Sequence, residues 1–212
     1  MNVSLIIPAY NEADHLPHLL NSVPSTVNEI IVVDDGSTDE TPTIVQNNGA
    51  VLVKHPVNKG KGIAMVSGIK KATGDVIVFM DADLQHHPED INRVLTPVLE
   101  GIADLSIGVR TLGSRKEMPP QRRFTNFLGN LLVFLRTWKW VSDTQSGFRA
   151  VRKEHLDKMT FKSQRYEIEI EMLIWASKLG MRIQEVPIKV KYGEEKSHWK
   201  VRNLLRVFKI LY

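Results

Sequence analysis

Cysteine is absent from this chain of 212 residues, and its absence excludes several kinds of site. Without a thiol the protein can form no disulfide, no thiolate nucleophile and no zinc–sulfur centre. A reducing compartment is therefore permitted.

Long apolar runs and two common phosphate-binding motifs are also missing. No segment approaches the roughly 20 apolar residues of a membrane-spanning helix. The longest candidate, Phe127–Leu135, is short and contains Gly129 and Asn130. The opening MNVSLIIPAY lacks a basic flank, so we expect no signal peptide. Neither G-x-G-x-x-G after the first expected strand nor G-x-x-x-x-G-K-[ST] occurs, which argues against a dinucleotide-binding Rossmann enzyme and a P-loop NTPase.

The composition is that of an ordinary globular chain. Hydrophobic residues make up 42% and charged residues 25%, enough for one α/β domain with a sizeable core. Lys and Arg number 28 against 24 acidic residues, which gives a net charge of +4. This mild positive excess could attract phosphates, anionic lipid or nucleic acid, and it does not choose among them.

The stretch Val76–Gln85 organises the rest of the sequence. Its first five residues, Val76–Met80, are apolar and predict a strand buried on both faces. Asp81 and Asp83 follow at the end of that strand, where open α/β sheets hold their ligands. Such a D-x-D pair can bind Mg²⁺ or Mn²⁺ and bridge it to a phosphate. The alternative is a simple turn in which Asp83 caps the next helix.

Strands and helices alternate along the first 110 residues, which predicts a doubly wound, mostly parallel sheet. We expect strands at 3–8, 29–33, 51–54, 75–80 and 105–109, and helices at 15–22, 41–46, 58–72 and 88–100. Polar residues follow the strands and should meet at one edge of the sheet. They are Tyr10, Glu12, Asp34, Asp35, Asp81 and Asp83.

The second half has a different pattern. Residues 110–123 form a basic loop that is either a solvated linker or a phosphate clamp. An apolar helix at 124–138 comes next, then a polar turn at 143–149 that leads into a short strand, and then an amphipathic helix at 168–179. A last strand at 181–190 contains Pro187 and should lie near an edge. The basic, amphipathic C-terminal segment could lie on an anionic membrane or pack on the domain.

Six motifs in order resemble glycosyltransferase family 2, and within it most closely the dolichol-phosphate mannose synthase group. They are P-A-Y-N-E (8–12), V-V-D-D-G-S-T-D-E-T (32–41), N-K-G-K-G-I-A (58–64), D-A-D-L-Q-H-H-P-E (81–89), S-G-F-R-A (146–150) and R-Y-E-I-E-I-E-M (165–172). The resemblance implies a GT-A fold over residues 1–190, followed by the C-terminal segment 191–212. The chain departs from the group near its end, where Gly193-Glu194-Glu195-Lys196-Ser197 replaces the usual G-x-S-K-L.

The resemblance also implies roles for particular residues. Asp81, Asp83 and Gln85 would hold a divalent metal and the diphosphate, with Ala82 between them, and Lys61 would lie beside the pocket. The base and ribose pocket would be lined by Pro8, Tyr10, Glu12, Asp34 and Asp35. Arg110 and Arg123 would face the phosphates and, with Asp83, serve catalysis. Ser146 and Arg149 would border the sugar and acceptor site, while Glu169 and Glu171 receive no firm role.

The implied reaction is an inverting, metal-dependent transfer of a hexose from a nucleotide sugar to a polyprenyl or dolichyl phosphate. GDP-mannose is the first choice of donor and UDP-glucose the second. We expect a cytoplasmic protein, peripheral on the cytoplasmic face of a membrane, with no nucleic-acid partner. One alternative is a soluble acceptor, with Glu169 or Glu171 as general base. Another is a protein that binds nucleotide sugars without turnover.

Overall fold

The structure is a computed structural model that describes residues 1–110 and 120–190, and the side chains of all of these except residues 120–125. Its strands are β1 Val3–Ala9, β2 Glu29–Asp34, β3 Val51–Lys54, β4 Val76–Phe79, β5 Leu105–Arg110, β6 Arg149–Arg152 and β7 Ile183–Ile188. Its helices are α1 Leu16–Asn21, α2 Thr41–Asn47, α3 Lys61–Lys71, α4 Ile91–Leu99, α6 Pro120–Thr137, α7 Lys153–Leu156 and α8 Ile168–Lys178, with a 3₁₀ turn η1 at Pro88–Asp90.

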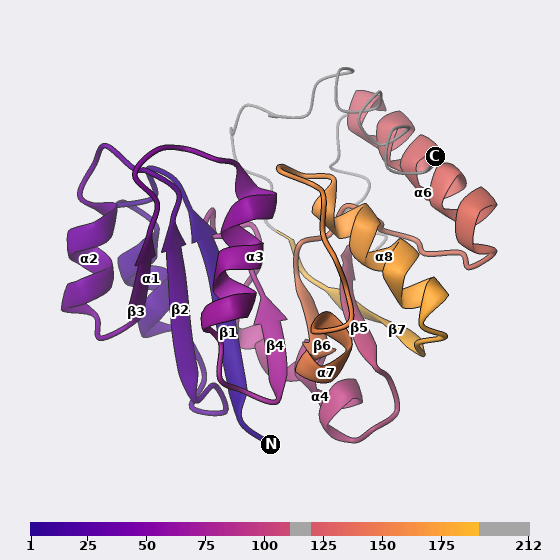
Figure 1. Ribbon diagram of the computed structural model, residues 1–212, viewed down its shortest axis with the longest axis horizontal. Helices are drawn as coiled ribbons and strands as arrows, with labels where there is room; N and C mark the ends of the chain where they lie inside the picture. The colour runs from indigo at the N-terminus through magenta and orange to yellow at the C-terminus, as the bar shows by residue number, and fades with distance from the viewer. Residues whose placement is uncertain (111–119, 191–212) are drawn as a thin grey trace.

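The strands form one sheet of seven in the order β3-β2-β1-β4-β6-β5-β7 (Figure 1). Strand β6 runs antiparallel to both of its neighbours, β4 and β5, and the other pairings are parallel. The expected α/β sheet, mostly parallel and in a single domain, is therefore confirmed.

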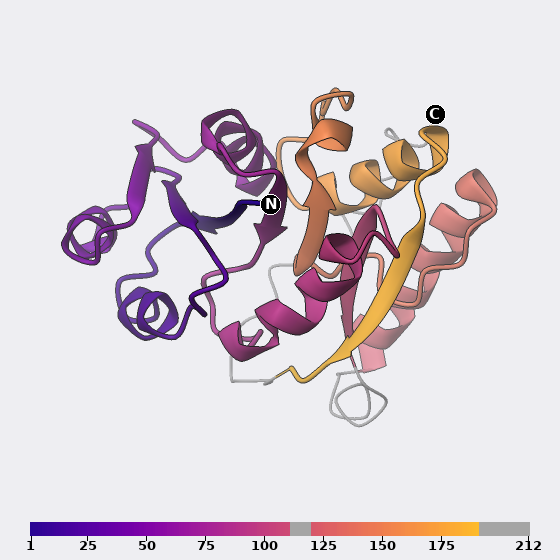
Figure 2. The same cartoon turned by 90° about the horizontal axis from the view of Figure 1, so that it is seen from below.

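Helices cover both faces of the sheet (Figure 2). The side chains of β1 alternate between two hydrophobic clusters, with Ile6 in one and Leu5 and Ile7 in the other. Helices α3 and α8 contribute to the first cluster, and α1 and α4 contribute to the second. This division follows from the two-residue period of a strand, which sends successive side chains to opposite faces.

The expected polar edge forms where β1, β2 and β4 end. Asp35 N–H donates to the Ala9 carbonyl at 2.8 Å, and Met80 N–H donates to the Ile6 carbonyl at 3.2 Å. The backbone ladder thus continues one residue past β2 and β4, and it holds the loops after the three strands side by side.

Helix α8 differs from expectation. We expected an amphipathic helix, yet residues 168–174 and Ala176 are all buried, Glu169 and Glu171 included. Glu169 is paired with the distant Lys61, and Glu171 accepts from backbone N–H groups of the turn before α8, so both carboxylates have partners in the interior.

Strand β7 has only β5 as a neighbour and lies at the edge of the sheet, as Pro187 predicted. The C-terminal segment 191–212 and most of the basic loop at 110–123 lie outside the described residues. Within 1–110 and 120–190, no helix combines the length and apolar content needed to cross a membrane.

Candidate active site

A cavity of about 650 Å³ opens at the edge where β1, β2 and β4 end. It lies where ligands bind in open α/β sheets, beyond the carboxyl ends of the strands. Its wall contains Pro8, Ala9, Tyr10, Glu12, Asp35, Asn58, Gly60, Lys61, Ala64, Asp81, Ala82, Asp83, Arg165 and Tyr166. Many of the residues expected in a nucleotide pocket therefore share one cavity.

The loop after β1 is fixed to the loop after β2. Asn11 has a left-handed backbone, with a φ of 55°, and its side-chain oxygen accepts from Thr38 N–H at 2.9 Å. Asn11 N–H donates to the Ser37 hydroxyl, and Glu12 N–H donates to the Thr41 hydroxyl, both at 2.9 Å. These contacts place Tyr10 and Glu12 on the cavity wall.

The two adjacent aspartates after Val33 have different roles. Asp34 is completely buried, and its Oδ1 accepts from Ser37 N–H at 2.9 Å, so it closes the turn and does not line the cavity. Asp35 lines the cavity and also holds the loop before α3. Its Oδ1 accepts from His55 Nδ1 at 2.7 Å and Lys59 N–H at 3.0 Å, while Oδ2 accepts from Gly60 N–H at 2.7 Å.

Lys61 links the D-x-D motif to α8. Its Nζ lies 2.6 Å from Asp81 Oδ1 and 2.7 Å from Glu169 Oε1. Burial alone would lower the pKa of Lys61, but the two carboxylates raise it above its usual value. Burial would raise the pKa of Asp81, and the Lys61 ammonium group reverses this and lowers it. Lys61 is therefore a permanent cation on the cavity wall.

Gly147 makes room for this ion pair. A Cβ atom at Gly147 would lie 2.8 Å from Asp81 Oδ2 and 2.9 Å from Lys61 Nζ. The two glycines around Lys61, of which Gly60 also lines the cavity, allow the turn before α8 to approach closely. A Cβ at Gly62 would lie 2.5 Å from the Ser163 carbonyl oxygen, and one at Gly60 would collide with that of Gln164.

Asp83 stands beside Asp81 on the cavity wall, in a tight turn. Gln85 N–H donates to Asp83 Oδ1 at 3.1 Å, and Leu84 between them has a left-handed φ of 55°. Gln85 itself does not line the cavity.

Among the described residues, no group of three or more His, Cys, Asp or Glu side chains could hold a metal ion. The two carboxylates are nevertheless the hard oxygen donors that Mg²⁺ and Mn²⁺ take when substrate phosphates complete the coordination. The residues present fit such an ion.

Three residues expected at the substrate are held by contacts within the protein. Arg110 binds Asp143 through two hydrogen bonds, of 2.7 and 3.2 Å, and does not line the cavity. The buried Ser146 hydroxyl donates to the Gly108 carbonyl at 2.6 Å. Arg149 is fully buried and donates to the carbonyls of Ser146, Thr144 and Glu169 at 2.6–2.8 Å. Burial lowers the pKa of Arg149 to about 10.

The resemblance placed Arg149 beside the sugar and acceptor, and in the structure its guanidinium group ties the polar turn to α8. Arg123 lies in α6, and its side chain is outside the described residues. Arg165 and Tyr166 belong to the cavity and were not singled out, although the R-Y-E motif contains them.

His86 of the D-A-D-L-Q-H-H-P-E motif packs against the ring of Phe148. It is buried, and its ring centroid lies 5.3 Å from that of Phe148. Burial lowers the pKa of His86 to about 4, so this side chain is neutral at physiological pH.

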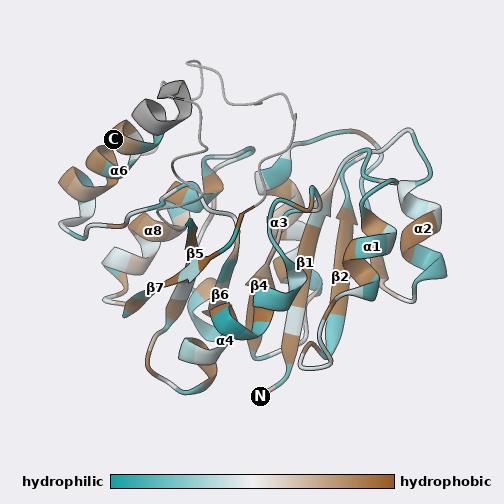
Figure 3. Cartoon of the chain, turned by 180° about the vertical axis from the view of Figure 1, so that it is seen from behind, coloured by the Kyte–Doolittle hydropathy of each residue, from teal (hydrophilic) through white to brown (hydrophobic). Residues whose placement is uncertain are grey.

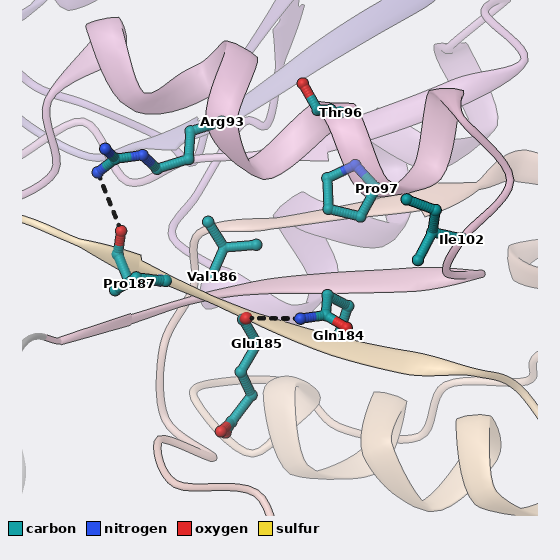
Figure 4. A pocket seen from close by; sticks show the side chains of 8 residues that line it. All are labelled: Arg93, Thr96, Pro97, Ile102, Gln184, Glu185, Val186 and Pro187. Carbon is teal, nitrogen blue, oxygen red and sulfur yellow. Dashed lines mark hydrogen bonds between the residues drawn. The ribbon is translucent and has the colours of Figure 1, made fainter.

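A second cavity, of about 450 Å³, lies between α4 and β7. Figure 4 shows its lining, which consists of Arg93, Thr96, Pro97, Ile102, Gln184, Glu185, Val186 and Pro187. Arg93 donates to the Pro187 carbonyl at 3.1 Å, and the Glu185 carboxylate points away and accepts from Ser142 N–H. The wall of this cavity includes the cation of Arg93, but it lacks the paired carboxylates of the first cavity.

The family model described as Glycosyl transferase family 2 matches residues 4–160. The chain belongs to glycosyltransferase family 2. A relative in this family, the UDP-N-acetylglucosamine–dolichyl-phosphate N-acetylglucosaminyltransferase of Methanococcus voltae, is 35% identical over 99% of this chain and 93% of its own length. An uncharacterised protein of Methanocaldococcus jannaschii is 38% identical over 99% of this chain and 89% of its own length.

Solved structures agree with this assignment. Glucosyl-3-phosphoglycerate synthase from Mycobacterium tuberculosis, in complex with Mn²⁺, UDP-glucose and phosphoglyceric acid, superposes with a TM-score of 0.80 at 27% identity. The match covers 99% of this chain and 78% of the synthase. This family 2 chain is thus a glycosyltransferase with the expected GT-A-like fold.

Proposed function

We propose that the protein transfers a sugar from a uridine diphosphate sugar to a polyprenyl phosphate, with a divalent metal ion. The observation that carries the proposal is a single cavity with Asp35 on its wall together with Asp81, Asp83 and Lys61. The carboxylate of Asp35 suits the nucleobase. The charged groups of Asp81, Asp83 and Lys61, together with a metal ion, suit the diphosphate.

The nucleotide is proposed from the hydrogen bonds that Asp35 already accepts. A carboxylate offers about four lone-pair positions. Three on Asp35 are taken, two of them on Oδ1, which leaves one position on Oδ2. Uracil presents one ring N–H, whereas guanine presents a ring N–H and an amino group side by side. Asp35 therefore suits uracil better than guanine, which moves our first choice of donor from GDP-mannose to a UDP sugar.

The names of similar proteins support the same choice. The Methanococcus voltae relative is named for UDP-N-acetylglucosamine, and the mycobacterial structure contains UDP-glucose and Mn²⁺. A dolichyl-phosphate β-glucosyltransferase of Trichomonas vaginalis is 30% identical over 88% of this chain and 64% of its own length. Both named transferases take dolichyl phosphate as acceptor.

The reaction suits a site without a general base. A lipid phosphate is already anionic at neutral pH, so it can attack the anomeric carbon without losing a proton. Asp81 and Asp83 would hold Mg²⁺ or Mn²⁺, which as a Lewis acid neutralises the leaving diphosphate. Lys61 adds a positive charge at the same place. Direct displacement inverts the anomeric centre.

A hydroxyl-bearing soluble acceptor is the weaker candidate because it needs a base. Glu169 is ion-paired to Lys61, and Glu171 accepts from the N–H groups of Lys162 and Ser163 at 2.9–3.1 Å. Both glutamates are therefore engaged, and neither is placed to act as a general base. The phosphoglyceric acid in the mycobacterial structure is the reason to keep soluble acceptors in the test.

The test is a transfer assay with Mn²⁺, a short-chain polyprenyl phosphate and radiolabelled UDP-N-acetylglucosamine, UDP-glucose or GDP-mannose in separate reactions. We expect label in the organic phase from a UDP sugar, and its loss in Asp83→Asn. Asp157→Asn is the control, because Asp157 is exposed, pairs with Lys153 and lies outside the cavity.

Transfer from GDP-mannose alone would overturn the choice of nucleotide. Label only in water-soluble product would move the acceptor to the soluble class. Donor binding without any product would favour the binding-only alternative. Retention of the anomeric configuration would refute direct displacement.

A further inference from the structure

The buried side of helix α6 is partly polar. Asn126, Asn130 and Val133 are buried at 8%, 5% and 1% exposure. The Asn130 amide donates to the Ser142 carbonyl at 2.8 Å, and its oxygen accepts from the Thr144 hydroxyl at 2.8 Å. Polar contacts thus help to fix α6 to the domain, and it packs on α8. The buried side thus combines the core contacts of Val133 with hydrogen bonds, whereas an ordinary surface helix buries an apolar side.

The outward side of α6 is apolar. Phe127, Leu131, Leu135 and Trp138 follow one another at intervals of four, four and three residues, which places them on one stripe. Phe127 is 54% exposed, Leu135 59% and Trp138 79%. Hydrophobic segments recur along α6 at the outside of the molecule in Figure 3. A stripe of this kind marks an interaction surface.

Trp138 is the least expected member of the stripe. It ends α6 with a left-handed φ of 56°, a conformation that glycine and asparagine adopt far more readily. Neither its local backbone nor burial accounts for a tryptophan there. Its ring packs edge-on against Phe134, and so does that of Trp140, both at 5.9 Å between centroids. Trp140 is itself 53% exposed, so the three rings form a preorganised aromatic cluster at the surface.

The charges of α6 are of one sign. Its 18 residues contain Arg122, Arg123 and Arg136 and no acidic residue, and Lys139 follows the helix. Tryptophan together with basic residues is the composition of helices that lie in the interface of an anionic bilayer.

We propose that the outward stripe of α6 and the Trp138–Trp140 turn dock the protein on an anionic lipid bilayer. The choice of a bilayer over a second copy of the chain rests on this charge complementarity, and on the proposed function, whose acceptor is a lipid. Only the outward side contacts lipid, because the polar side is bonded to the domain. Two other occupants, a second copy and the chain's own C-terminal segment, are outcomes of the test.

The test measures binding of the full chain to vesicles by sedimentation, without donor or acceptor. We expect binding to vesicles with 30% phosphatidylglycerol that weakens as salt is added, and much weaker binding to pure phosphatidylcholine. Leu135→Gln should reduce the partition coefficient by about tenfold, since one large apolar side chain no longer enters the interface. Ile102→Gln is the matched control: Ile102 is 57% exposed in the α4–β5 turn, and its replacement should change nothing.

Trp138→Asn separates docking from folding. Asparagine suits the left-handed backbone at this position, so the melting temperature of the variant should equal or exceed that of the wild type. Its binding to anionic vesicles should fall by at least about tenfold. The difference in emission between the wild type and this variant reports on Trp138. Acrylamide should quench that part of the wild-type emission in solution, and anionic vesicles should protect it from acrylamide.

Absence of wild-type binding to anionic vesicles would overturn the proposal, as would equal binding to neutral ones. So would a wild-type dimer that Leu135→Gln dissociates, or a Trp138 already shielded from acrylamide by the chain itself. Transfer to a short, detergent-dissolved acceptor should be unchanged in Leu135→Gln. Failure of docking and failure of the proposed reaction are thus measured separately.

Discussion

Replacing Lys61 by methionine should destabilise the protein strongly. The side chain keeps its length but loses the charge that lies 2.6 Å from Asp81 and 2.7 Å from Glu169. At an effective dielectric constant of 20, each contact attracts by about 6 kcal/mol before desolvation is subtracted. Glu169 is only 2% exposed, and removing the partner of a buried charge typically costs about 3–5 kcal/mol. We expect a loss of that size in the free energy of unfolding.

The assay is urea unfolding at pH 7.5, followed by circular dichroism. Lys61→Met/Glu169→Gln should recover most of the loss, because the buried charge is then removed together with its partner. Lys70→Met is the control: Lys70 is exposed on the same helix, and its replacement should change stability by less than about 0.5 kcal/mol.

The contribution of the Lys61–Asp81 pair to the free energy of unfolding should also depend on pH. Lys61 lowers the pKa of Asp81 below its usual 3.8, so the stability from this pair is fully present above about pH 4. It disappears as the pH falls through the lowered pKa, where Asp81 takes up a proton in the folded state. The part of the stability difference between wild type and Lys61→Met that comes from Asp81 should therefore shrink below about pH 4. A loss under 1 kcal/mol at pH 7.5, or a double variant no more stable than Lys61→Met, would refute the reasoning.

Three further predictions concern residues at increasing distance from the cavity. Gly147→Ala should reduce kcat/KM with little change in melting temperature, because the new Cβ would lie 2.8 Å from Asp81 and displace its side chain; unchanged kinetics would contradict this. Arg149→Met should lower the melting temperature by about 10 °C, since three buried carbonyls lose a charged donor at a cost of about 3–5 kcal/mol. Hydrogen bonds from Arg182 hold the pKa of Asp104 at about 2, so in Asp104→Asn the loss of stability seen at pH 7 should fade between pH 4 and pH 2. Parallel unfolding midpoints across that range would count against it.

The sequence predicted the sheet because local patterns decide it. Strand β3 was expected at the observed residues, and the polar ends of β1, β2 and β4 meet as their shared direction required. Strand β6 was expected only as a short strand after a polar turn. Its antiparallel place between β4 and β5 depends on contacts across the sheet, which no local pattern encodes.

The candidate site was predictable in its residue types and not in its pairings. Asp35, Asp81 and Asp83 line the cavity, as their motifs implied. Arg110 lies at the end of a strand and Arg149 follows a polar turn, and a ligand-binding arginine could occupy either position. Only the structure shows that Arg110 is bound to Asp143 and Arg149 to backbone carbonyls. Glu169 illustrates the same limit, because its partner Lys61 is more than 100 residues away in sequence.

The position of β4 separates most of the cavity wall from the second half of the sheet. Apart from Arg165 and Tyr166, the cavity wall is built from residues that precede Leu84, and the strands before β4 in sequence all lie on one side of it in the sheet. The strands that follow β4 lie on its other side, in the half that also includes α6. Helix α6 contributes no residue to the cavity wall, so we expect substitutions on its outward side to leave that wall intact. If the cavity binds the nucleotide sugar as proposed, such a partition would let the surface of the second half adapt to a new acceptor without a change in the donor site.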